Sequence, residues 1–407
     1  MKSRFRPLLA MVILVFASLA CVSVLGGKGD QTPSSDAVST AVALTLQAVT
    51  PVAGVQTTPP PVKQTLLPHS LYFLASDDAG VTQVFRFEQD GQTRKQVTSE
   101  PGNVGRFGVS PVDGSVAYVL NNQLILVNAD GSGRRVLVDG GAEDAINPFL
   151  NRIHNPVFSP DGQTLAYGYK GLNFYSLPAG TNTLAIKDRV KDMGNGTIFP
   201  SELYWPEKYS PDGSKLMITL GYYEGAEAAF YDPQSKSLVR LEAAPGALIC
   251  CDGALWSADG TRVYSGNAAA GMFNPGLWQV DTTSGAVTTL LASDYDTNTF
   301  NLAKYPYLAT DHQLYYFFLK SSTGEYSRTP LQLVRSAPDG VTGQTLLRDE
   351  TFERMTEALW APDASFVIVA NATTEQMYQG GQAQIVYLDG RPDRKLVDFA
   401  QQMRWGP

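Results

Sequence analysis

Ser159-Pro160-Asp161-Gly162 is one copy of a turn motif that returns about every fifty residues along this chain. Proline presets φ for the first corner of a type I turn, aspartate can bond back to the backbone, and glycine takes the left-handed position that follows. A large apolar residue precedes each copy and a β-prone run follows it, so each copy predicts a hairpin. The other copies, two of them degraded, are Ser110-Pro111-Val112-Asp113-Gly114, Ser210-Pro211-Asp212-Gly213, Ser257-Ala258-Asp259-Gly260, Ala309-Thr310-Asp311-His312 and Ala361-Pro362-Asp363-Ala364.

The spacing of the motif predicts a repeat architecture. After each hairpin come two further strand-like runs, for example 171–177 and 183–186. Four short antiparallel strands per unit form one blade of a β-propeller. Residues 70–99 supply only three strands, whereas 403–407 match the opening of a repeat and then stop. We therefore expect an all-β fold, a seven-bladed β-propeller of four-stranded antiparallel blades that is closed by the C-terminal strand.

The Ser-Pro-Asp-Gly turn after an aromatic residue resembles the repeats of the WD-repeat-like, TolB-type propeller family of bacterial envelope proteins. The resemblance covers about residues 70–407. It implies the propeller fold and says little about activity, because the family includes both protein-docking modules and the propeller halves of serine peptidases. Function must therefore be argued from the site.

The N-terminus has the layout of a bacterial export signal. Three basic residues precede an apolar run over 8–20, and Cys21 follows directly. This arrangement is typical of a lipoprotein signal peptide over 1–20, with Cys21 as the lipid anchor. The alternative is that the segment stays uncut as a membrane anchor. Either outcome predicts an extracytoplasmic protein, tethered at the cell surface or in the periplasm.

Residues 21–69 are rich in proline, serine and threonine, which predicts a disordered linker before the propeller at 70–407. The formal net charge of the chain is −8, and cleavage after residue 20 would remove three positive charges and no negative one. An acidic surface argues against nucleic acid and anionic lipid headgroups as partners. With 43% hydrophobic residues, the chain can fill the cores between blades, and we expect a monomeric propeller.

The long connections are of two kinds, those between blades and those between the second and third strands of a blade. In an up-and-down blade both kinds emerge on the same side. Between blades they are expected at 140–153, 187–203, 242–252, 293–303 and 348–356, and within blades at 221–227, 266–276, 320–330 and 371–383. Loops longer than the fold requires often carry function, so we expect a partner to bind this long-loop face. Some of its aromatic residues could instead merely cover the blade ends. The expected contact residues are Tyr222, Tyr223, Met272, Phe273, Asp294, Asp296, Tyr326, Met377 and Tyr378.

A second candidate site is the mouth of the central channel, where charged groups near the starts of innermost strands could bind a polar ligand or do acid-base work. His154 is expected to be structural there, because no paired nucleophile accompanies it. The residues expected at the mouth are His154, Glu207, Asp252, Lys304, Glu357 and Arg404.

Cys250-Cys251 is an unusual local feature in a long connection. Outside the cytoplasm such neighbours could form a strained vicinal disulfide that serves as a ligand platform or a redox-labile element. Alternatively, the pair only braces the loop, or the thiols stay reduced and buried.

Sequence motifs for catalysis are missing, since neither a Gly-x-Ser-x-Gly elbow nor a His-Glu-x-x-His motif occurs. The three histidines are scattered, and Asp294-Tyr295-Asp296 lacks the distal glutamate of a calcium loop, so we expect no metal and no cofactor. The leading hypothesis is a non-catalytic propeller that binds an envelope or extracellular protein, or another macromolecule such as a glycan. The alternative is a receptor for a glycan or small polar ligand, or an enzyme, using the channel mouth.

Overall fold

The computed structural model describes residues 65–194, 196–250, 253–323 and 330–407. These residues belong to the second of two compact units, Lys63–Pro407. They form β-strands and one short 3₁₀ helix, η1 (Pro148–Leu150). No helix among them is long and apolar enough to span a membrane.

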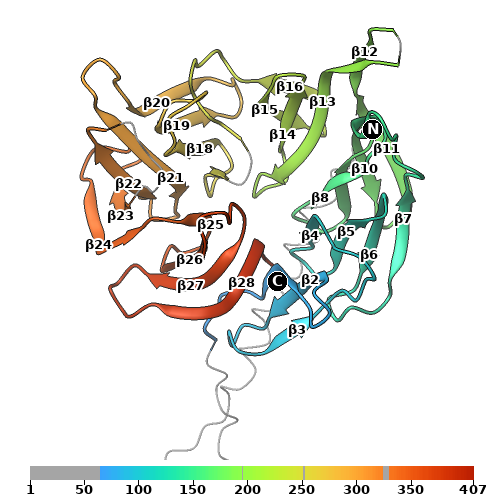
Figure 1. The fold of residues 1–407 in the computed structure, drawn as a ribbon, viewed down its shortest axis with the longest axis horizontal. Helices are drawn as coiled ribbons and strands as arrows, with labels where there is room; N and C mark the ends of the chain where they lie inside the picture. Colours follow the sequence, from blue (N-terminus) through green and yellow to red (C-terminus); the bar gives the residue numbers. More distant parts are fainter. Residues whose placement is uncertain (1–64, 195, 251–252, 324–329) are drawn as a thin grey trace, which may run out of the picture. The chain divides into compact units, whose positions relative to one another are not determined.

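In the described residues the strands form antiparallel sheets that are arranged around a common centre (Figure 1). The N-terminal half contains β1 (Leu71–Ser76), β2 (Thr82–Phe87), β3 (Arg94–Gln96), β4 (Phe107–Val109), β5 (Val116–Leu120), β6 (Gln123–Val127), β7 (Arg135–Asp139), β8 (His154–Phe158), β9 (Thr164–Gly168), β10 (Gly171–Ser176), β11 (Thr181–Lys187), β12 (Arg189–Asp192), β13 (Ile198–Tyr209), β14 (Leu216–Tyr222), β15 (Gly225–Asp232) and β16 (Ser237–Arg240). The C-terminal half contains β17 (Ala254–Trp256), β18 (Arg262–Asn267), β19 (Gly276–Asp281), β20 (Val287–Ala292), β21 (Phe300–Leu308), β22 (Leu314–Ser321), β23 (Leu331–Ser336), β24 (Thr345–Phe352), β25 (Met355–Trp360), β26 (Phe366–Asn371), β27 (Gly381–Tyr387) and β28 (Arg394–Trp405). Multiple sheets have the expected four strands, for example β4 to β7 and β17 to β20.

The repeated turn builds the hairpins that the sequence predicts. At Ser159 the backbone N–H of Thr164 donates to the serine Oγ at 3.0 Å, and that hydroxyl donates to Asp161 Oδ1 at 2.5 Å. Gly162 has φ of 67°, the left-handed conformation that favours glycine. The degraded turns keep this backbone without glycine, since φ is 60° at His312 and 54° at Ala364. The turn therefore keeps its left-handed conformation even where a residue with a Cβ makes that conformation unfavourable.

The last strand, β28, belongs to two sets of strands. Its first part pairs with β27, as in Gly381 with Ala400, and its last part pairs with β1, as in Leu71 with Trp405. The C-terminus therefore supplies the strand missing beside β1, as predicted, and joins β1 to β3 with β25 to β27 in one seven-stranded sheet (Figure 1). The indole of Trp405 strengthens this connection by donating to the carbonyl oxygen of Trp360 at 2.8 Å.

The innermost strands contact one another in cyclic order. β28 contacts β4, β4 contacts β8, and β8 contacts β13; on the other side β17 contacts β21, β21 contacts β25, and β25 contacts β28. Between β13 and β17, Lys208 Nζ donates to the carbonyl oxygen of Ala254 at 2.7 Å. Gly108 is required in β4, because a Cβ there would lie 2.5 Å from the carbonyl oxygen of Pro156 in β8.

Apolar cores fill the space between neighbouring sheets. Tyr72 and Val84 of the first sheet pack in one buried cluster with Phe107 and Tyr118 of the next. The hydroxyl of Tyr72 donates to the carbonyl oxygen of Gly114 at 3.1 Å, so the core also contacts a repeated turn. Outside the strands, Leu67 is fully buried in the core cluster that includes Leu71 and Phe73.

Three connections expected to be long loops are largely regular structure. Residues 187–203 contain β12, which pairs with the start of β13 as an extra hairpin beyond the four-stranded pattern. Residues 221–227 form a tight turn in which Tyr222 pairs with Gly225. Over 348–356, β24 runs to Phe352 and β25 begins at Met355. Many residues in these segments are not β-prone, so pairing with the neighbouring strand, more than local propensity, extends the strands where a loop was expected.

Candidate functional site

Both classes of long connection lie on one side of the sheets. The β5–β6 turn bonds the β7–β8 connection, where Asn122 Nδ2 donates to the carbonyl oxygen of Gly141 at 2.9 Å. The backbone N–H of Asn274, between β18 and β19, likewise donates to the carbonyl oxygen of Gly246, between β16 and β17, at 2.8 Å. This side is the long-loop face.

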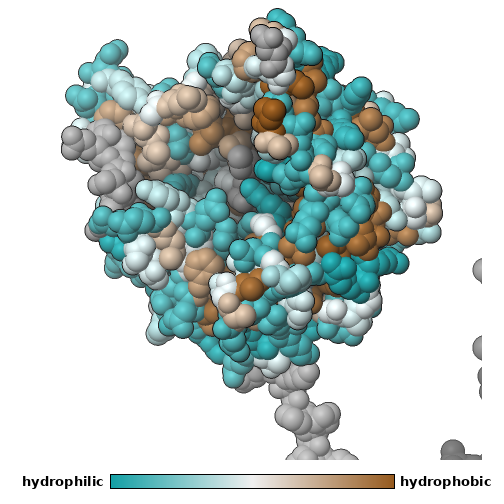
Figure 2. Space-filling view, turned by 45° about the vertical axis from the view of Figure 1, so that its right-hand side comes forward, coloured by the Kyte–Doolittle hydropathy of each residue, from teal (hydrophilic) through white to brown (hydrophobic). Residues whose placement is uncertain are grey.

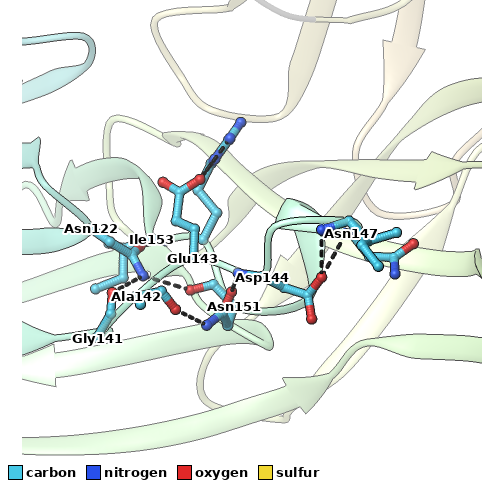
Figure 3. Close-up of polar contacts among 10 residues, drawn as sticks. Asn122, Gly141, Ala142, Glu143, Asp144, Asn147, Asn151 and Ile153 are labelled. Carbon is cyan, nitrogen blue, oxygen red and sulfur yellow. Dashed lines mark hydrogen bonds and ion pairs between the residues drawn. The ribbon is translucent and has the colours of Figure 1, made fainter. Parts of the chain in front are cut away.

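Asn122, in the β5–β6 turn, forms hydrogen bonds with the connection 140–153 (Figure 3). Asn122 is 5% exposed and has φ of 57°, a conformation that asparagine tolerates better than most residues. Its amide nitrogen donates to the carbonyl oxygens of Gly141 and Asn151, at 2.9 and 3.0 Å. Its Oδ1 accepts the backbone N–H of buried Ile153 at 2.7 Å. One side chain from another hairpin therefore holds both ends of the connection.

A second set of bonds orders the middle of the same connection (Figure 3). Asn151 donates from Nδ2 to the carbonyl oxygen of Ala142 at 2.7 Å and accepts the backbone N–H of Asp144 at 2.8 Å. Asp144 Oδ1 in turn accepts the backbone N–H groups of Ile146 and Asn147, at 3.0 and 2.7 Å.

These bonds present an apolar side chain to solvent. Ile146 is 79% exposed although its own backbone is fixed by Asp144. In the same connection, Arg152 donates through Nε and Nη2 to Glu143 Oε2, at 2.9 and 2.7 Å. A groove of about 620 Å³ runs along the connection and includes Glu143, Arg152 and His154. Sequence reasoning missed Ile146, because its exposure depends on Asn122 and Asn151, which the local pattern does not connect to it.

A second groove on this face joins residues from both predicted sites. It measures about 660 Å³ and is lined by Lys304 from the expected channel mouth together with Met377 and Tyr378 from the expected contact set. Tyr378 is 84% exposed, whereas burial lowers the pKa of Lys304. An aromatic ring and a half-buried ammonium group thus border the same space.

The remaining predicted contact residues lie on different connections. Met272 is 85% exposed and Phe273 is half-buried beside it. The ring of Tyr223 lies 4.4 Å from that of Phe199 in the extra hairpin. Tyr222 donates to Glu227 Oε1 at 2.7 Å, so its hydroxyl is engaged within its own sheet. Figure 2 shows a largely hydrophilic surface on which apolar side chains form separate patches.

Asp294 and Asp296 form a capped turn. Asp294 Oδ1 accepts the backbone N–H of Asp296 at 2.9 Å, and Thr297 donates to Oδ2 at 2.8 Å. These hydrogen bonds, led by that of Thr297, lower the pKa of Asp294. In the described parts of the chain no three His, Cys, Asp or Glu side chains gather as a metal site. Tyr326, Asp252 and Cys251 lie outside the described residues, as does Cys21, so the predicted vicinal disulfide and lipid anchor remain predictions.

The predicted mouth residues divide among several environments. The ring of His154 packs edge-on to Trp205 at 5.8 Å and covers Gly168, where a Cβ would lie 2.0 Å from the imidazole. Burial, with smaller contributions from two arginines, lowers the pKa of His154 to about 4. Glu357 accepts the backbone N–H groups of Gln402 and Met403, at 2.6 and 2.9 Å, and so orients the end of β28.

Glu207 and Arg404 do come together, in a cavity of about 150 Å³ among β4, β8, β13 and β28. Thr219 Oγ1 donates to Glu207 Oε1 at 2.9 Å. Arg106 and Gln402 also line this cavity, and neither was predicted. Innermost strands that border this cavity have register shifts, such as that between Pro206 and Lys208, and such shifts redirect side chains.

The four-stranded sheets and the cyclic contacts of their innermost strands determine the fold class. The described residues form a β-propeller. No protein-family model matches the sequence, and no curated protein matches it. Among solved structures, a puromycin-hydrolyzing peptidase from Mycobacterium tuberculosis has a TM-score of 0.53 at 15% identity over 82% of this chain and 52% of the peptidase. This chain therefore spans about half the length of that peptidase.

TolB from Acinetobacter baumannii is also similar, with a TM-score of 0.42 at 15% identity over 83% of this chain and 82% of TolB. The β-propeller domain of Cps50 (Swd1) from Myceliophteria thermophila has a TM-score of 0.44 at 12% identity over 76% of this chain and 88% of that domain. The predicted propeller fold is confirmed by the four-stranded antiparallel sheets in cyclic contact, and solved structures of a TolB protein and a WD-repeat-type propeller are among those similar to this chain. At these identities the likeness concerns the fold alone.

Proposed function

We propose that this chain is a non-catalytic β-propeller that binds a protein partner through its long-loop face. The proposal includes seven blades, obtained by dividing the largest sheet at β28 into a set with β25 to β27 and a set with β1 to β3. It also includes export by the signal peptide over 1–20, lipidation of Cys21 and a linker over 21–69, which would hold the propeller outside the cytoplasm.

The observation that carries the proposal is the fixed presentation of Ile146. Ordering the backbone that carries an exposed apolar side chain brings no burial to the isolated protein, whereas it lowers the entropy cost of binding a partner. The bonds of Asn122, Asn151 and Asp144 accomplish that ordering. Interfaces often depend on a few apolar anchors on a rigid frame. Tyr378 and Met272 add further exposed side chains of the kinds enriched at protein interfaces.

The placement of the histidines supports a non-catalytic role. His154 is packed between Trp205 and Gly168, and His312 occupies a repeated turn. His69 lies with its ring 6.4 Å from that of Trp405. Each thus has a structural surrounding of its own, and a nucleophile–base pair needs two groups within hydrogen-bond reach.

The test is affinity capture from the envelope fraction with the tagged full-length protein and two variants. Ile146→Ser should reduce capture of the partner about tenfold, the effect expected for a moderate anchor residue. Val112→Ser is the matched control, because Val112 is also exposed but lies in a repeated turn at the opposite ends of the strands. Equal capture by the two variants would contradict the proposal.

A further inference from the structure

The cavity among β4, β8, β13 and β28 contains a buried polar atom without a partner. Gln402 is 7% exposed, and its Nε2 donates to the carbonyl oxygen of Gly105 at 2.9 Å. That bond fixes which end of the amide is which, and in the described chain Oε1 has no hydrogen-bond partner. Buried acceptors are nearly always satisfied, because desolvation without a bond costs free energy. An unsatisfied acceptor lining a cavity indicates a missing donor.

Two residues other than glycine at the same cavity adopt the left-handed backbone conformation, which is unfavourable for residues with a Cβ. Gln402 has φ of 54° and Asn155, also at the cavity, has φ of 48°. Both sit near register shifts of innermost strands, between Tyr72 and Leu74 for the β1–β28 pair and between His154 and Val157 for the β8–β9 pair. Bulges that redirect side chains and left-handed residues other than glycine are concentrated at functional sites.

The charges around the cavity favour an anion. Two guanidinium groups, those of Arg106 and Arg404, belong to residues that line it, against one carboxylate, that of Glu207. Lys208 also lines the cavity, and its ammonium group donates to the carbonyl oxygen of Ala254. Guanidinium groups bind carboxylates with charge-assisted hydrogen bonds. The volume of about 150 Å³ limits the occupant to a small molecule. Trp405 is also a lining residue of the cavity.

We propose that this cavity binds a small carboxylate that also carries a hydroxyl or amino group, such as a 2-hydroxy acid or a 2-amino acid. The carboxylate pairs with Arg106 and Arg404, and the hydroxyl or amino group donates to Gln402 Oε1. Ile146 does not line this cavity, so the small ligand and the protein partner are tested with different variants.

Four probes of nearly equal size test separately whether binding needs the carboxylate and whether it needs the hydroxyl or amino group. L-lactate and L-alanine carry both groups, propionate lacks the donor, and 1,2-propanediol lacks the charge. The full-length protein is titrated with each while tryptophan fluorescence, to which Trp405 contributes, and thermal unfolding are followed. We expect saturable binding of lactate or alanine with a dissociation constant of about 1 mM or tighter, reasonable for about six non-hydrogen atoms. Propionate should bind at least about tenfold more weakly, and the diol should not bind.

Three variants connect binding to the cavity. Arg106→Gln should weaken binding at least about tenfold and Arg106→Lys should restore part of it, since Arg106 is exposed at the rim and its exchange spares the packing. Arg135→Gln, on the outer strand β7, should bind as the wild type does. No saturable response to lactate or alanine, equal binding of propionate, or unchanged binding by Arg106→Gln would each overturn the proposal.

Discussion

Replacing Asn122 by glycine tests whether one side chain orders the connection 140–153. Glycine accepts the φ of 57° without strain, so the change removes the amide and leaves the turn intact. Three hydrogen bonds disappear, each worth about 1 kcal/mol. One of them leaves the N–H of Ile153 buried and unpaired, and such a group costs about 1–3 kcal/mol. The expected loss of unfolding free energy is about 3 kcal/mol.

Asn121→Gly is the matched control, since Asn121 is the exposed neighbour in the same turn with φ of 49°. Both variants exchange asparagine for glycine at positive φ, so the effect on backbone entropy and strain is the same in each. The difference between their losses of unfolding free energy therefore measures the hydrogen bonds of the Asn122 side chain. Chemical denaturation measures that difference, and hydrogen exchange of a peptide covering 140–153 shows where protection is lost. A difference below about 1 kcal/mol, less than a single buried unsatisfied N–H should cost, would refute the reasoning.

Three further predictions concern the scaffold and are checked by chemical denaturation. His312→Gly should stabilise the protein by about 1 kcal/mol, because it removes the strain of a side-chain-bearing residue in the left-handed conformation. Gly162→Ala should destabilise the protein by a similar amount, because it introduces the same strain. Changes of the opposite sign would refute the claim that the repeated turn requires the left-handed conformation. Gly108→Ala should cost about 2 kcal/mol through its clash with β8, whereas Gly105→Ala, which meets open space, should cost less than about 0.5 kcal/mol; equal effects would contradict the close approach of the innermost strands. Glu100→Gln should cost about 2 kcal/mol at pH 7, because the buried carboxylate accepts hydrogen bonds from Tyr118 and Arg134. Burial opposes ionisation of Glu100, but these partners outweigh it and lower its pKa, so its contribution is complete above the unfolded pKa of about 4.3 and is lost as the pH falls through the lower folded pKa. A gap between wild type and Glu100→Gln that stays constant down to acidic pH would contradict this.

Features with a local or periodic cause could be predicted from the sequence. The Ser-Pro-Asp-Gly turns determine their own hairpins, and the missing strand of the first unit was recognisable because 403–407 repeat the opening of a unit. The long-loop face followed from connectivity alone. These parts of the fold need no knowledge of contacts distant in sequence.

The site residues were harder to predict, because their positions depend on other elements. Ile146 is presented by bonds from Asn122 in a different hairpin. Gln402 faces the cavity because β28 shifts register beside β1, and a shift of one residue exchanges the two faces of a strand. The extra hairpin of β12 and β13 was missed because its first strand follows β11 after a single residue, Asp188.

Site-specific photo-crosslinking in the cell of origin tests the central claim most directly. A photoreactive residue is placed at Ile146 on the long-loop face, and in a parallel strain at Val112 in a repeated turn. Docking through the long-loop face predicts a discrete protein adduct from position 146, weakened when Asn122→Gly is added, and no such adduct from position 112. The absence of an adduct at 146, or the same adduct from both positions, would contradict the account.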